Sequence, residues 1–213
     1  MLISTATAAG LLGDALGVEG FHPLISGVDM DELTLADLFV NHTPESEDIH
    51  LEADEVIAFG TRIRHLSDSS ALAPLIFRVN ITAPHPDEVR SALDGRILRT
   101  HAGVSYTNRL GLSEDDWVGG FTGTWRVSEK KADYLADHHA LLVAACQGYV
   151  APECVRTIVG WEPVEGSPRR FFHTEPAPAE VSEMAGDGLW IDVLPVREAA
   201  IDVDDIDDVA TAT

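Results

Sequence analysis

The stretch TGTWRVSEKKADYLADHHALLVAACQGYVAPECVRTIVGWEPVEG, residues 122–166, decides the fold class of this chain. Its residues predict a strand at 123–128 and a short helix at 129–139. An unbroken apolar run predicts a buried strand at 140–146, and one or two further strands are expected within 149–164. Short strands with a small helix between them favour a compact α+β domain.

Strands are also expected on both sides of this stretch. Alternating side chains between two prolines predict a strand within 73–84, because proline suits the ends of a strand better than its interior. Further strands are expected at 96–108 and 169–178, and the imperfect alternation of 49–66 predicts two strands that break near Gly60. Five or more short strands predict a small, mostly antiparallel β-barrel or strongly bent sheet.

Short helices complete the predicted α+β fold. Small apolar residues at 4–18 indicate a loosely packed helix or a hairpin, and 29–40 has the pattern of an amphipathic helix. A helix is expected at 84–95, where a proline fits the first turn and a glycine fits the end. A capped turn is expected at 112–120. No strand–helix–strand unit has the spacing of a parallel sheet.

The formal net charge of −22 is concentrated at the two ends of the chain. Residues 1–61 hold 12 acidic residues and no Lys or Arg, whereas residues 62–175 hold 14 acidic and 13 basic residues. Residues 176–213 hold 10 acidic residues and one Arg. Strong negative charge repels nucleic-acid phosphate, so these numbers argue against non-specific DNA or RNA binding by the whole surface. A local site within 62–175 is compatible with them.

The same distribution divides the chain into three parts. We expect an acidic, partly helical N-terminal extension at 1–48 and a barrel-like α+β domain at 49–178. The segment 179–213 is expected to hold one strand, at 189–196, and an acidic tail, at 201–213. The chain has no apolar run long enough to span a membrane and no basic residue before its apolar start. We therefore expect a cytoplasmic protein with no membrane partner, or part of a particle assembled inside the cell.

Signals for catalysis, cofactors or metals are sparse. No cofactor and no metal site is expected, and whether the protein is an enzyme stays open, with a non-catalytic role favoured. Cys146 and Cys154 are the only cysteines, and we interpret them as two reduced, semi-buried thiols. The sequence has no phosphate-binding glycine loop and no nucleophile elbow. His65 and His173 each begin a motif similar to the paired His-x-Ser/Thr of two-histidine phosphoesterases. The second motif has a glutamate in place of the hydroxyl residue, which favours surface or strand-end histidines.

The candidate binding residues are aromatic residues and arginines near the quoted stretch. Aromatic rings and arginines on a small barrel can stack a nucleobase and hold phosphate. The alternative is that most of these rings form the core of a small β domain. The candidates are Trp125, Trp161, Tyr149, Arg126, Arg156, Arg169 and Arg170.

Residues 96–178 also resemble a known domain pattern. A strand with TWRVS is followed by ALLVAACQGYV, then by IVGWEPV and RRFFHTEPAP. This order is similar to that of the PUA-like superfamily, which includes the EVE and ASCH domains. The resemblance implies a compact barrel that binds RNA or a modified base in an aromatic cleft, with Trp125 and Trp161 as cleft residues. The acidic flanks and residues 1–61 depart from this pattern.

Two functional hypotheses follow. The first is a non-catalytic binding module that recognises a nucleobase or modified nucleic acid in an aromatic and arginine cleft, with a nucleic acid or nucleotide as ligand. The alternative is a structural or interaction protein of a larger assembly, for example a viral particle, that binds protein partners through its acidic ends. The alternative predicts that five apolar side chains near the ends are exposed: Leu11, Leu12, Leu38, Phe39 and Trp190.

Overall fold

A computed structural model of the protein describes residues 1–18, 38–45, 48–66, 72, 75–104, 113–146 and 148–191. Within these residues the fold is mixed α+β, as the sequence predicts, with five α-helices and twelve strands. The predicted tail at 201–213 lies outside the described residues, as does the helix predicted at 29–40 up to residue 37.

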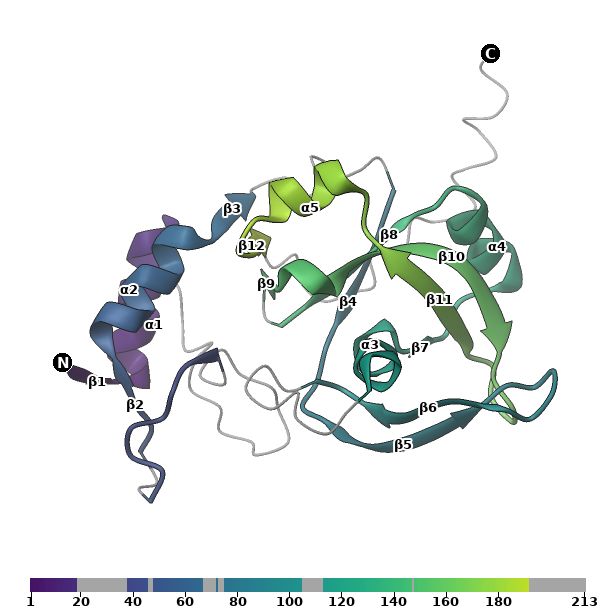
Figure 1. Ribbon diagram of the computed structural model, residues 1–213, viewed down its shortest axis with the longest axis horizontal. Coiled ribbons are helices and arrows are strands. Elements are labelled where there is room, and N and C mark those ends of the chain that lie inside the picture. The colour runs from purple at the N-terminus through teal and green to yellow at the C-terminus, as the bar shows by residue number, and fades with distance from the viewer. Residues whose placement is uncertain are drawn as a thin grey trace, which may run out of the picture.

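The largest sheet has five strands in the order β4, β8, β10, β11, β7 and curls around the helix α3, Glu114–Thr122 (Figure 1). The strands are β4 Ile76–Asn80, β8 Leu141–Ala145, β10 Val155–Pro163, β11 Arg170–Pro176 and β7 Thr124–Trp125. Three of the four pairings are antiparallel. Each of these strands lies within a segment that the sequence predicts to be a strand.

The fourth pairing, between β4 and β8, is parallel, so the sheet is mostly antiparallel, as predicted. The connection between these strands runs through residues 81–140 and contains α3, one further helix, a hairpin and the strand β7. Parallel neighbours need a crossover connection, and a crossover this long has no local signature in the sequence. All five residues of β8 are buried, which agrees with the buried strand predicted at 140–146.

Residues 85–102 form a hairpin, so the helix predicted at 84–95 is wrong. Its strands are β5 His85–Arg90 and β6 Ile97–Ala102. Val89 is buried between two exposed neighbours, which is the two-residue period of a strand. Gly95 has a φ of 74° in the turn, so this glycine serves the hairpin and not a helix end. β6 confirms the strand predicted within 96–108.

Residues 49–66 contain a helix, so the prediction of two strands broken near Gly60 is wrong. The elements are β2 His50–Glu52, α2 Ala53–Arg62 and β3 Arg64–Leu66. The buried residues of α2 recur at three- and four-residue spacing, which places them on one helix face. A Cβ built on Gly60 would lie 2.7 Å from the Cβ of Ala15 in the N-terminal helix. Gly60 therefore permits close packing of two helices.

The four other helices begin at capping residues or after a proline. The helix predicted within 4–18 is α1, Thr5–Leu16, and the one predicted at 129–139 is α4, Glu129–Asp137. A serine N-cap accepts a backbone hydrogen bond at the start of each. The capped turn predicted at 112–120 is the start of α3. The sequence did not predict α5, Ala179–Ala185, which follows Pro178.

Small sheets connect the ends of the described chain to its middle. The strand β12, Leu189–Ile191, lies between β3 and β9, Tyr149–Val150, and is parallel to β3. The strand β1, Leu2–Ser4, pairs antiparallel with β2. A 3-10 turn at Pro152–Cys154 separates β9 from β10. The strand predicted at 189–196 is confirmed over its described residues.

The apolar side chains near the two ends pack into the protein. Leu12, Phe39 and Trp190 are buried, with exposed fractions of 0%, 7% and 1%. Leu11 and Leu38 are partly buried against the same core. The exposure that the assembly hypothesis predicts is therefore not observed at these five residues.

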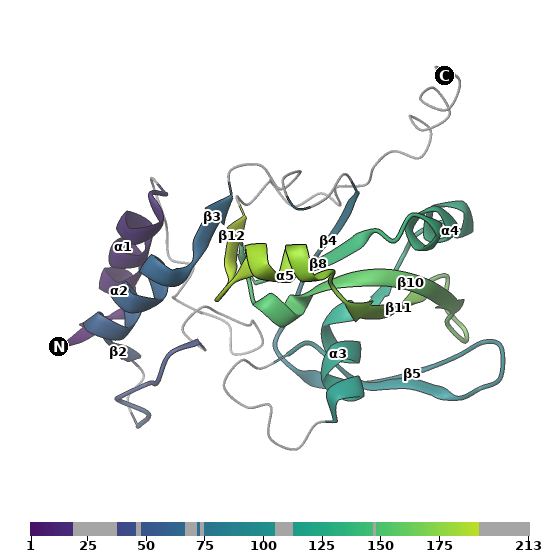
Figure 2. The same cartoon turned by 45° about the horizontal axis from the view of Figure 1, so that its top comes forward.

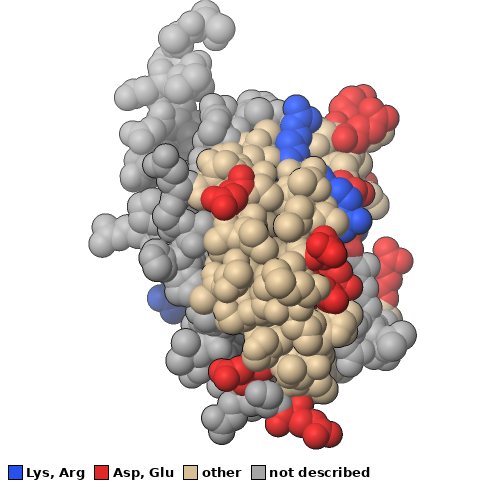
Figure 3. All heavy atoms as spheres, turned by 90° about the vertical axis from the view of Figure 1, so that its left-hand side faces the viewer, with Lys and Arg blue, Asp and Glu red and all other residues tan. Residues whose placement is uncertain are grey.

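The end of the molecule with α1 and α2 carries scattered Asp and Glu side chains and a few Lys or Arg side chains, with uncharged surface between them (Figure 3). At the other end, β10 and β11 lie between α4 and the β5–β6 hairpin (Figure 1, Figure 2). No helix among the described residues is long and apolar enough to cross a membrane.

Candidate ligand-binding cleft

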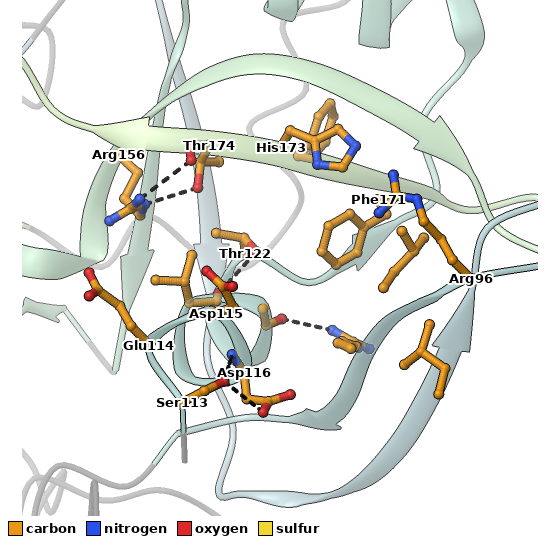
Figure 4. A pocket seen from close by; sticks show the side chains of 16 residues that line it. Arg96, Ser113, Glu114, Asp115, Asp116, Thr122, Arg156, Phe171, His173 and Thr174 are labelled. Carbon is orange, nitrogen blue, oxygen red and sulfur yellow. Dashed lines mark hydrogen bonds between the residues drawn. The ribbon is translucent and has the colours of Figure 1, made fainter.

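An open cleft of about 530 Å³ lies between α3 and the wall formed by β6, β10 and β11. Polar side chains from all four elements line it, and Figure 4 shows how they face one another. Arg156 and Glu114 lie at one end of the cleft, and Arg96 and His173 lie at the other. Binding pockets for small molecules commonly measure about 300–1,000 Å³, so the cleft has room for a ligand.

Two glycines hold α3 close to β6. The N–H of Gly103 donates to the carbonyl of Gly120 at 2.9 Å. A Cβ on Gly120 would lie 2.4 Å from the carbonyl oxygen of Gly103, which is closer than any side chain can approach. Gly103 also has a φ of 77°, a conformation that favours glycine. The absence of side chains here sets the distance between the two walls of the cleft.

The start of α3 brings three carboxylates to one wall. Ser113 caps the helix, because its Oγ accepts from the N–H of Asp116 at 3.1 Å. Glu114, Asp115 and Asp116 form the first turn, where the unpaired N–H groups and the helix dipole favour negative charge. All four residues line the cleft. This wall therefore offers hydrogen-bond acceptors to a ligand.

A buried carboxylate lies behind the opposite wall. The side chain of Glu162 is 7% exposed and accepts three hydrogen bonds. Its Oε2 accepts from Ser91 Oγ at 2.5 Å, and its Oε1 accepts from His173 Nε2 at 2.6 Å and from Arg96. Every carboxylate oxygen thus has a donor, as a buried charge requires.

These contacts determine the protonation of His173. Burial lowers the pKa of His173, and the positive charge of Arg96 lowers it further, so the imidazole is neutral at neutral pH. Arg96 keeps its charge and favours the ionised form of Glu162, which can only accept hydrogen bonds. The proton of the neutral ring is therefore on Nε2, and the lone pair is on Nδ1.

Arg156 is the cation at the other end of the cleft. Its Nε donates to Thr174 Oγ1 at 2.9 Å and its Nη2 to the Thr174 carbonyl at 3.4 Å. No carboxylate among the described residues lies within ion-pair distance of this guanidinium. Burial lowers the pKa of Arg156, and the nearby charge of Glu114 opposes that shift. Arg156 therefore keeps donor capacity that a ligand can use.

Arg99 is a structural cation beneath the cleft. It is 5% exposed, forms an ion pair with Asp87, and donates to the carbonyl of Gly119 at 3.4 Å. Burial lowers the pKa of Arg99, and the charge of Asp87 opposes this effect. The side chain thereby ties β5 and α3 to β6, and supports the floor of the cleft.

Three of the predicted binding residues, Trp161, Arg170 and Trp125, lie on the face of the sheet that α4 covers. Trp161 is half-buried on β10, and its Nε1 donates to Asp133 of α4 at 2.9 Å. The guanidinium of Arg170 lies 5.1 Å from the centre of the Trp161 ring. Trp125, on β7, pairs with Arg170 and contacts Phe77 edge-on at 6.1 Å between ring centres. The two tryptophans share one sheet, and both are partly buried against the core.

The remaining predicted residues are dispersed. Tyr149 is buried in the sheet with β12, where its ring lies 5.1 Å from that of Phe59. Arg126 and Arg169 are exposed, and Arg169 donates to Thr124 at 3.5 Å. Of the seven predicted binding residues, Arg156 alone lines the cleft.

The polar network beside the cleft is formed by other residues, which the sequence analysis did not select for binding. Glu162 and Ser91 were not considered. His173 was weighed as part of a two-histidine motif with His65 and interpreted as a surface or strand-end histidine. The position of Glu162 along the strand could have identified it. Alternate residues of a strand point to the same face, so Glu162 shares a face with the buried Val164. A charge on an inward strand face indicates a buried partner. His65 lies on β3, in a different sheet, and does not line the cleft.

Cys146 and Cys154 are both buried thiols. Within the described ranges, no group of three or more His, Cys, Asp or Glu side chains is placed to hold a metal ion. Comparison of the chain with protein-family models, with curated proteins and with solved structures gave no match.

Proposed function

We propose that the protein is a binding module that recognises a nucleobase, or a modified base of a nucleic acid, in the cleft between α3 and β11. The observation that carries this proposal is the opposition of Arg156 to the acidic start of α3 across one cleft. Arg156 donates hydrogen bonds from one wall, and the carboxylates of the other wall accept them. The edge of a nucleobase presents donors and acceptors side by side, so it can satisfy both walls.

The ring side chains of the cleft support the same ligand class. The side chain of His173 is 37% exposed, and its ring meets Phe171 edge-on at 5.5 Å between centres. A planar ligand between these rings and α3 would exclude water from the polar contacts, which strengthens them. The cleft is thus suited to a flat, polar ligand.

The net charge of the chain indicates which part of a nucleic acid would be bound. A charge of −22 repels a long phosphate backbone, so the base and not the backbone provides the affinity. The resemblance of residues 96–178 to the PUA-like superfamily supports base recognition as well. In this proposal, the curled sheet and the β5–β6 hairpin correspond to the barrel of that superfamily, and the cleft replaces the expected site at Trp125 and Trp161.

Calorimetric titration with nucleosides, short RNA and short DNA tests the proposal. We expect saturable binding, and the variant Arg156→Ala should weaken it about tenfold or more, because a charged hydrogen bond contributes about 1.5–3 kcal/mol. Arg126→Ala is the matched control, since Arg126 is exposed and does not line the cleft. An equal loss of affinity in both variants, or no binding of any probe, would contradict the proposal.

A further inference from the structure

We infer that His173 determines which ligands the cleft accepts, because its Nδ1 accepts a hydrogen bond from an N–H group on the edge of the bound base. The inference rests on the proposed function and goes one step further. It selects bases with a ring N–H on the edge that faces β11, such as uracil and guanine, over bases in which that nitrogen is methylated.

The first step of the argument is the orientation of the ring. Nε2 of His173 donates to Glu162 at 2.6 Å, and Glu162 is held in turn by Ser91 and Arg96. Ser91 Oγ also accepts from the N–H of Leu93 at 3.1 Å, so the hydroxyl hydrogen is directed at Glu162. The ring therefore has one hydrogen-bonded orientation, in which Nε2 faces away from solvent toward a buried carboxylate.

The second step is the charge around the ring. Glu162 on β10 and Arg96, just before β6, are the charged groups in contact with the His173 network. Their charges offset each other, so no net negative charge remains to hold a second proton on the imidazole. The other charged groups that line the cleft lie on its remaining surfaces: Arg99 on β6, Arg156 on β10, and Glu114, Asp115 and Asp116 on α3.

The third step is the chemistry that this leaves in the cleft. A neutral imidazole with its proton on Nε2 presents an acceptor at Nδ1, and His173 lines the cleft. Arg96 lies at the same end of the cleft and, as a cation, can only donate. An N–H donor of the ligand satisfies Nδ1, whereas a methyl group or a lone pair at the same place leaves a desolvated acceptor unpaired. Sites built to pair a ligand N–H reject the analogue that lacks it.

The binding test compares uridine with 3-methyluridine, and guanosine with 1-methylguanosine, on the full chain. We expect each parent nucleoside to bind about tenfold or more tightly than its methylated form at pH 7.5, from the cost of an unpaired buried acceptor. Protonation of Nδ1 removes the acceptor, so the affinity for the parents should fall as the pH drops through the pKa of His173. In the variant His173→Phe both the preference and the pH dependence should disappear.

A second measurement does not depend on any ligand. Nitrogen-15 NMR of the free protein should show His173 with the proton on Nε2 and a bare Nδ1 at pH 7.5. The variant Glu162→Gln should allow a mixture of the two tautomers, and should reduce the preference for the parent nucleosides more than their average affinity. This distinguishes a residue that positions His173 from one that only stabilises the fold.

The outcomes separate the inference from the proposed function. If parent and methylated nucleosides bind equally at every pH, the role of His173 is wrong and the proposed function stands. A proton on Nδ1 in the free protein also overturns the role of His173. If no nucleoside binds the native protein, both the inference and the proposed function fail.

Discussion

The two faces of the β10–β11 strand pair differ in chemistry although the same strands build both. On one face Trp161 lies directly opposite Phe172, and α4 covers the tryptophan. On the other face Glu162 lies opposite Phe171, and its carboxylate accepts from three donors beside the cleft. Alternation along a strand places these adjacent residues on opposite sides.

The two faces stabilise the fold in different ways. Apolar packing on the Trp161 face contributes through buried area and tolerates small shifts. The Glu162 face contributes only while every donor stays in place, because a buried charge without a partner is costly. Apolar residues of similar size would stabilise that face as well or better. A polar network at such a position, next to a cleft, is consistent with a role in binding.

The largest effect is expected from Gly120→Ala, at the contact of α3 with the end of β6 beside the cleft. The new Cβ would lie 2.4 Å from the carbonyl oxygen of Gly103, so α3 must move away from β6. We expect the free energy of unfolding to fall by about 2–4 kcal/mol, in the range of severe overpacking. Urea denaturation measures this loss.

The matched control is Gly10→Ala in α1, where the added Cβ meets nothing within 4 Å. Alanine has the higher helix propensity, so this variant should gain up to about 1 kcal/mol. If both alanine variants were equally stable, the close contact of α3 with β6 would be wrong.

The second effect is the loss of the buried carboxylate in Glu162→Ala. Removing one partner of a buried charged network costs about 3–5 kcal/mol when all partners are buried. Here Arg96 and His173 are 52% and 37% exposed and can return to water, which reduces the cost. We expect a loss of about 2–3 kcal/mol, mainly from the buried Ser91, and about 1–2 kcal/mol for Glu162→Gln. Urea denaturation measures the free energy of unfolding of both variants. If neither differed from the native protein, the Glu162 network would not contribute to stability.

Local signals predicted much of the fold. The serine caps at the starts of α3 and α4 satisfy helix N–H groups within three residues, so a short window of sequence suffices. The wrong predictions came from glycines that fit two different local structures. Gly95 marks a helix end or a hairpin turn equally well, and Gly60 marks a strand break or a close helix contact. Which use applies depends on contacts far away in the sequence.

The candidate site was less predictable because its residues are distant in sequence. Glu162 meets Ser91 across 71 positions and Arg96 across 66. These contacts require the β5–β6 hairpin, and the sequence pattern favoured a helix over half of that hairpin. Arg156 was predicted because it is a cation that can bind a ligand, and the same property gives it a role in the proposed cleft. The tryptophans were predicted because their rings can stack a nucleobase, but they lie on the face that α4 covers.

A third and smaller effect concerns the apolar face. Trp161→Phe removes the hydrogen bond to Asp133 and weakens the contact with Arg170, while the ring remains. We expect a loss of about 0.5–1.5 kcal/mol, because both contacts are partly exposed. A double-mutant cycle with Asp133→Ala isolates the pair, and its coupling energy should carry most of this loss. Nucleoside binding should be unchanged. A drop in affinity would mean that the two faces are not independent.

The smallest effect is a pH dependence that belongs to His173. Its folded pKa lies below the ordinary value of 6.5, so below pH 6.5 the unfolded chain takes up the proton first. The native protein should therefore lose stability, relative to His173→Phe, as the pH falls from about 6.5 to the folded pKa, and the difference should then level off. Thermal unfolding of both proteins at a series of pH values measures it. The opposite sign would mean that Glu162 outweighs burial and Arg96 and keeps the ring charged, which would make Nδ1 a donor and reverse the selectivity inferred for the cleft.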